Sequence, residues 1–80
     1  MGSAELMQRV RAIYEERLRK DLENTYLDSF VAIEPESGDC FLGRTMSDAA
    51  AAAHLIHPGR RCGVLRIGHR ATVHLGAAGQ

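Results

Sequence analysis

One long amphipathic helix constrains the fold of this chain more than any other feature. Residues 4–26 read AELMQRVRAIYEERLRKDLENTY, and apolar residues recur there at steps of three and four: Leu6, Val10, Ile13, Tyr14, Leu18, Leu22 and Tyr26. At roughly 1.5 Å per residue, such a helix is about 34 Å long. The chain has only 80 residues, which make one small domain with a thin core, and domains of this size often gain stability by oligomerising. We therefore expect part of the apolar stripe to meet a second copy or a partner.

The next segment predicts a hairpin. Residues 29–34 (SFVAIE) and 39–44 (DCFLGR) read as strands, and Pro35 and Gly38 suit the turn between them. The acidic residues here, Glu34, Glu36 and Asp39, are interpreted as solvated turn residues rather than as catalytic acids, because a general acid needs a perturbed pKa. Two registers stay open. A three-residue loop puts Val31, Ile33 and Phe41 on one face, and a four-residue loop puts Val31, Ile33, Cys40 and Leu42 there.

The second half predicts a short helix followed by another strand pair. Thr45 with Asp48, or Ser47 in its place, can cap a helix that contains five consecutive alanines and ends at Pro58-Gly59. Residues 61–67 and 71–75 read as strands. A three-residue loop, 68–70, pairs odd with odd positions and places the apolar side chains on one face: Leu65, Ile67, Ala71, Val73 and Leu75.

Together these elements predict a single α+β domain over residues 1–80, with the order α-β-β-α-β-β and a disordered tail at 76–80. A right-handed crossover makes the second and third strands parallel and gives a small sheet in the order 2-1-3-4. We expect the Ala-rich helix and part of the long helix to cover one face of this sheet. The other face would then be open to solvent or to a partner.

The sequence offers no pattern of catalytic or metal-binding residues. His54 and His57 are spaced for one ion but lack third and fourth ligands, and Cys40 and Cys62 fit no zinc motif. No nucleophile elbow, Walker motif or zinc-protease motif is present. We therefore predict a protein that is not an enzyme and that has no cofactor and no metal.

Charge suggests a second hypothesis, nucleic-acid binding. Residues 1–39 contain nine acids and five bases, whereas residues 40–80 contain one acid and five bases. If odd positions point inward, Arg60, Arg66, Thr72 and His74 share an outer sheet face with Cys62 and Val64, and such a basic face could contact phosphates. Both Phe residues lie in the first hairpin and the pI is about 6.9, so this hypothesis ranks second.

The chain shows no signal peptide and no apolar run near the ~20 residues of a membrane span. A cytoplasmic location with reduced thiols is therefore expected.

The segments FVAIEPESGDCFLG and LRIGHRATVHLG resemble a family of short uncharacterised bacterial proteins. Its members tend to have a long charged helix, a Phe-Val-Ala-Ile-Asp-Pro-Glu-[Ser/Thr]-Gly-Asp hairpin and a closing Leu-Arg-Ile-Gly-Tyr-Arg strand pair. The likeness covers roughly residues 14–76, with Glu34 in place of the usual Asp and His69 in place of the usual Tyr. The resemblance implies no activity, and by analogy alone it suggests an antitoxin-like accessory role.

The hypothesis that combines these observations is a non-catalytic interaction module that self-associates as a dimer or higher oligomer and binds a protein partner. The residues predicted to carry the interaction come from the long helix and from the stretch around Gly68: Leu6, Val10, Ile13, Leu18, Arg66, His69 and Arg70.

Overall fold

The computed structural model describes residues 3–68 and 73–75, and the predicted α+β class is confirmed. Three helical segments come first, of which the middle one, η1, is π-helical: α1 (Ser3–Ile13), η1 (Tyr14–Leu18) and α2 (Arg19–Thr25). The strands and the remaining helix follow: β1 (Phe30–Ile33), β2 (Cys40–Gly43), α3 (Met46–Ile56), β3 (Gly63–Arg66) and β4 (Val73–Leu75). β1, β2 and β3 are each shorter than the sequence predicts. In the described part of the chain, no helix is both long enough and apolar enough to cross a bilayer.

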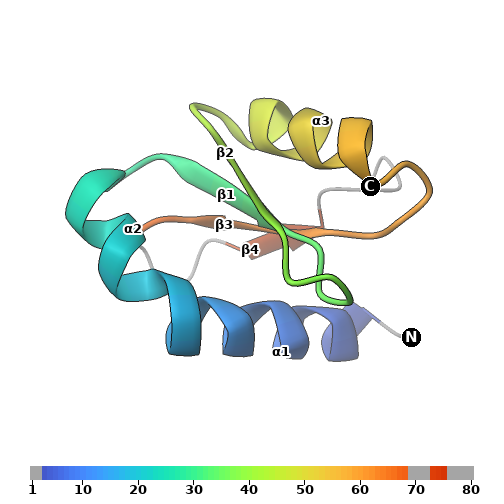
Figure 1. Ribbon diagram of the computed structural model, residues 1–80, viewed down its shortest axis with the longest axis horizontal. Helices are drawn as coiled ribbons and strands as arrows, with labels where there is room; N and C mark the ends of the chain where they lie inside the picture. The colour runs from blue at the N-terminus through green and yellow to red at the C-terminus, as the bar shows by residue number, and fades with distance from the viewer. Residues whose placement is uncertain (1–2, 69–72, 76–80) are drawn as a thin grey trace.

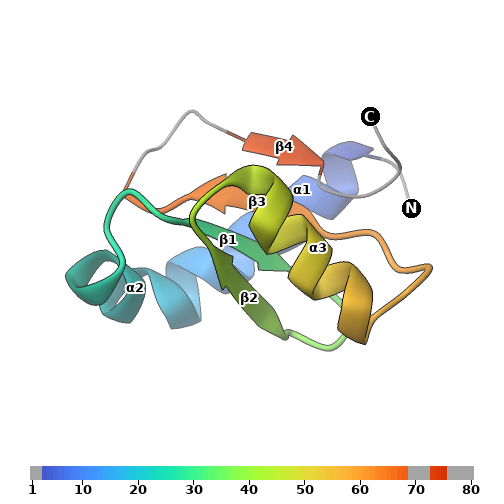
Figure 2. The same cartoon turned by 90° about the horizontal axis from the view of Figure 1, so that it is seen from above.

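The strands form a sheet in the order β2-β1-β3-β4, and each neighbouring pair is antiparallel. β2 therefore lies at one edge of the sheet and pairs with β1 alone. The connection from β2 to β3 passes through α3, which lies over β2 and β1 (Figure 2).

The two faces of the sheet are covered by different helices, so the expectation of one open face is wrong. Figure 1 shows α3 on one side of the sheet and α1 on the other. Two separate clusters of buried side chains correspond to these layers. On the α3 side, Cys62 and Val64 are buried against Ala32, Ala49 and Ala53, because alanine side chains let the helix backbone approach the sheet closely.

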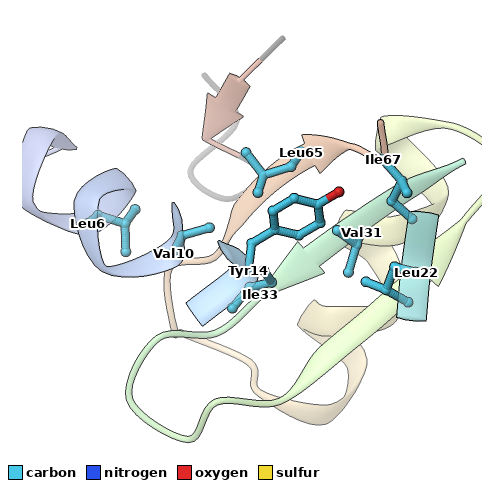
Figure 3. Close-up of a cluster of buried hydrophobic side chains, with 8 residues drawn as sticks. All are labelled: Leu6, Val10, Tyr14, Leu22, Val31, Ile33, Leu65 and Ile67. Carbon is cyan, nitrogen blue, oxygen red and sulfur yellow. The ribbon is translucent and has the colours of Figure 1, made fainter. Parts of the chain in front are cut away.

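The helical arm consists of α1, η1 and α2, and its apolar stripe packs into the core of its own chain. Leu6, Val10, Tyr14 and Leu22 pack against four residues of the sheet, as Figure 3 shows: Val31, Ile33, Leu65 and Ile67. Leu6 and Val10 are only 2% and 0% exposed. The sheet therefore already covers these four positions of the stripe, whereas Tyr26 at its end is 44% exposed, and self-association stays a prediction.

The π-helical segment explains how a stripe with this spacing stays on one side. The buried positions Leu6, Val10, Tyr14 and Leu22 lie four residues or a multiple of four apart. In a regular α-helix each step of four overshoots a full turn by about 40°, so Leu22 would end up about 160° away from Leu6. A π-turn contains more residues than an α-turn. We infer that η1 absorbs part of this overshoot, which keeps Leu22 facing the sheet.

The hairpin registers follow from the strand pairs. Val31 is paired with Leu42 and Ile33 with Cys40, which selects the four-residue loop of the two alternatives for the first hairpin. In the second hairpin, Leu65 is paired with Val73, so odd positions pair with odd positions as predicted. The rest of that loop and the tail at 76–80 lie outside the described residues.

The start of α3 agrees with the predicted cap, since the Thr45 hydroxyl accepts a hydrogen bond from the Asp48 N–H at 3.0 Å. Just before it, Gly43 marks a close approach between β2 and the helix. A Cβ at Gly43 would lie 2.4 Å from the backbone nitrogen of Ala49. A Cβ at Gly63 would instead meet the side chains of Met7 and Val10 at 2.9 Å.

We predict that Gly43→Ala lowers the free energy of unfolding by about 1–3 kcal/mol, because the backbone of α3 must move to admit the methyl group. Gly63→Ala is the matched control and should cost less, because its methyl group meets side-chain atoms of Met7 and Val10 and not the backbone of a helix. Urea denaturation of both variants measures the difference. Equal losses would show that α3 is free to shift away from β2.

Candidate interaction surface at the β2 edge

The carboxylate of Glu34 is buried, which corrects its interpretation as a solvated turn residue. The side chain of Glu34 turns back into the β1–β2 turn, and the residue is 1% exposed. Its two oxygens accept the backbone N–H groups of Glu36 at 3.1 Å and Ser37 at 2.8 Å. Arg60 lies 3.6 Å from it, on the chain that follows α3. The buried charge is therefore matched by donors from the turn and by one guanidinium.

The pKa of Glu34 is lowered by this environment. Burial alone would raise the pKa, but hydrogen bonds from Ser37 and from the Glu36 backbone, together with the charge of Arg60, outweigh it. The carboxylate is thus held ionised, which suits a structural anion and not a general acid that must carry a proton near neutral pH.

Ser37, Asp39 and His57 lie together in the same region but not in the geometry of a catalytic triad. Nε2 of His57 is 2.7 Å from Asp39 Oδ2 and 3.5 Å from Ser37 Oγ, so one ring nitrogen faces both partners. A relay needs the carboxylate on one nitrogen and the nucleophile on the other. The group instead ties the end of α3 to the turn, together with an ion pair of 2.9 Å between Arg60 and Glu36.

Residues that could hold a metal do not gather in the described part of the chain, where no group of three or more His, Cys, Asp or Glu side chains is found. Cys40 and Cys62 are free thiols. Burial is the main cause that raises the pKa of both, and Asp39 raises the pKa of Cys40 further. Neither thiol is thereby activated as a nucleophile.

A polar cleft of about 500 Å³ lies between η1 and the end of β3. Four of its polar side chains bond to one another. Arg19 pairs with Glu15 at 2.8 Å and with Glu23 at 3.3 Å. The Tyr14 hydroxyl donates to Glu23 at 3.0 Å and accepts the Gly68 N–H at 3.4 Å. The cleft is therefore largely a hydrogen-bonded seam between helix and sheet, and the Arg11 side chain also lines it.

The described residues predicted to carry an interaction do not form one exposed surface. Leu6 and Val10 are core residues, and Ile13 and Leu18 are half-buried against the same cluster. Arg66 lies at the end of β3, where its guanidinium stacks 5.8 Å from the ring centre of Phe30 and lies 4.0 Å from Asp28. The other two, His69 and Arg70, lie outside the described residues.

Part of the basic sheet face predicted for nucleic-acid binding is covered by α3. Cys62 and Val64, which were placed on it, are buried under this helix. Arg60 is engaged with Glu34 and Glu36. Thr72 lies outside the described residues, and nucleic-acid binding stays a prediction.

The outer side of β2 forms one edge of the sheet, and β4 forms the other. The Glu34 N–H donates to the Asp39 carbonyl at 2.9 Å, so Asp39 points its backbone groups toward β1. Alternation along an antiparallel ladder then turns the backbone N–H and C=O of Cys40 and Leu42 away from β1. Among the described residues, no backbone hydrogen bond pairs these outward groups.

Apolar side chains flank these free backbone groups. Leu42 is 37% exposed and Cys40 is also exposed, both on the face that carries α1. Phe41 is half-buried on the α3 face, where its ring meets His57 edge-on. The strand itself contains no Lys and no Pro, two residues that often protect an edge. β2 is short, with four residues, and presents an apolar edge.

No family model matches the chain, and no match was found among curated proteins or among solved structures. The candidate surface therefore rests on geometry alone. The predicted order 2-1-3-4 already places the second strand at an edge, but the sequence does not show that the outward backbone groups of Cys40 and Leu42 stay unpaired in the described part of the chain. The signal available was the apolar run Cys40-Phe41-Leu42 without a protecting charge.

We predict that Glu34→Gln destabilises the fold at neutral pH by about 1–3 kcal/mol, because it removes hydrogen bonds to a charged acceptor. A lowered folded-state pKa contributes stability that is complete above the unfolded value of about 4.3 and is lost as pH falls through the folded value. The difference between wild type and variant should therefore shrink below about pH 4. Denaturation at several pH values measures it, and Glu36→Gln, at an exposed position, serves as the control. A difference that stays constant with pH would contradict a lowered pKa for Glu34.

Proposed function

We propose that this protein is a non-catalytic interaction module that binds another protein chain along β2, by adding a strand to its sheet. The observation that carries the proposal is the set of outward N–H and C=O groups of Cys40 and Leu42, flanked by exposed apolar side chains. Strand addition uses such groups for affinity and the alternating side chains for specificity.

The surroundings of β2 support this role because they hold the strand rigidly. The Glu34 carboxylate fixes the turn before β2, and the close contact at Gly43 fixes its other end against α3. An edge that is already ordered loses little conformational entropy when it binds, which favours association.

The absence of catalysis is part of the proposal. The titratable side chains around the turn are engaged in ion pairs and hydrogen bonds with one another: Glu34, Glu36, Asp39, His57 and Arg60. A cytoplasmic, antitoxin-like or regulatory setting, as the resemblance to short bacterial proteins implies, is compatible with a binding edge and stays a prediction.

Selection of peptides from a random displayed library tests the function. We predict that selected peptides alternate apolar and polar residues and that their binding perturbs the amide NMR signals of residues 40–42 most. Leu42→Lys should abolish their binding, because a charge at the edge opposes strand addition. The stability of the variant should change by less than about 0.5 kcal/mol, since the side chain is partly exposed.

Leu55→Lys is the matched control, because Leu55 is an apolar residue that is 79% exposed on α3, outside the β2 edge. It should leave peptide binding unchanged. Peptides that perturb the cleft at Tyr14 and Arg19 instead of β2 would contradict the proposal.

A further inference from the structure

We propose that the strand added to β2 is the β2 strand of a second copy of this chain, so that two sheets join antiparallel across a twofold axis at Phe41. This inference rests on the proposed function, since it names the partner of the same edge. A symmetric interface uses the same patch on both subunits, and the patch must therefore complement itself.

The hydrogen-bond pattern limits the registers that two β2 strands can adopt. In an antiparallel pair, residues directly opposite either both point their backbone groups at each other or both point away. The outward groups of β2 belong to the even positions Cys40 and Leu42. The twofold axis must therefore pass through a residue position and not between two positions.

Among these registers, the axis at Phe41 pairs the largest number of outward backbone groups within β2. It places Cys40 opposite Leu42 of the second copy, so both outward residues find a partner within β2. An axis at Leu42 would pair Cys40 with Arg44, beyond the end of the strand, and an axis at Cys40 would pair Leu42 with Gly38, in the turn. The Phe41 register also covers the exposed side chains of Cys40 and Leu42 with each other.

Charge complementarity favours the antiparallel arrangement of two copies. One end of β2 carries the acidic residues Glu36 and Asp39, whereas Arg44 follows its other end. An antiparallel pair brings the basic end of each strand beside the acidic end of the other. Opposite charges at neighbouring positions attract across a ladder, which favours the alignment.

The α3 layer also continues across the proposed axis. α3 runs antiparallel to β2, since Ala49 lies at Gly43 and His57 lies at Asp39. With Ala49 and Ala53 facing the sheet, the right-handed helical spacing puts Ala52 and Ile56 on the flank of α3 that faces the outer side of β2, away from β3. Ile56 is 58% exposed. Two copies joined along β2 would bring these apolar flanks toward each other.

Disulfide trapping in a mixture of two variants tests the register. The unmodified chain supplies Cys40, and a double variant, Cys40→Ser with Leu42→Cys, supplies a thiol at the opposite position. Opposite residues in such a pair have Cα atoms about 5.5 Å apart, which a disulfide can span. Mild oxidation should link the mixture into covalent dimers. Each protein alone should stay monomeric on a denaturing gel, because its thiols face a Leu or a Ser.

Two controls separate this inference from the proposed function. The double variant Cys40→Ser with Arg44→Cys should not link to the unmodified chain, and efficient linking there would place the axis at Leu42 and overturn the register. Sedimentation velocity should show a monomer–dimer equilibrium that Leu42→Lys removes and Leu55→Lys leaves intact. A monomer at millimolar concentration would overturn the second copy as partner, while peptide binding at β2 would still support the proposed function.

Discussion

The packing of the helical arm against the sheet is the contact on which the rest of this structure depends. Four buried side chains of the arm meet four of the sheet in one cluster. Their spacing along the arm matches a regular α-helix poorly, and the π-turn at Tyr14–Leu18 compensates. The arm and α3 thus cover opposite faces of the sheet, and among the described residues the outer side of β2 stays open as an edge.

The buried carboxylate of Glu34 makes the turn before β2 rigid, because its contacts hold the turn together. A carboxylate removed from water is costly unless donors surround it, and Glu34 has two backbone N–H groups and the Arg60 guanidinium. Arg60 also holds Glu36, and His57 holds Asp39. The chain that follows α3 is thereby fastened to the turn. These contacts among the acidic residues of the turn, His57 and Arg60 serve to hold an edge strand in place.

A binding edge and an enzyme site differ in which polar groups are left without partners in the free protein. A site leaves donors, acceptors and charges poised for a substrate. In the turn and in the cleft at Tyr14, these groups are bonded to each other. At β2 the free groups belong to the backbone and their neighbours are apolar. Such a surface suits another extended chain better than a small polar molecule.

The sequence by itself determined the α+β class, the cap at Thr45 and the odd-to-odd pairing of Leu65 with Val73, because each depends on local periodicity or on neighbouring residues. It also contains two further signals. The four-residue spacing of the buried stripe indicates the π-turn, and the lack of a charge within Cys40-Phe41-Leu42 indicates the open edge. Only the tertiary structure decided that the helices lie on opposite faces, that Glu34 is buried and that Cys40 and Leu42 leave the edge of β2 apolar and exposed. Burial depends on contacts between residues far apart in the chain, such as Arg60 with Glu34, and local patterns do not encode them.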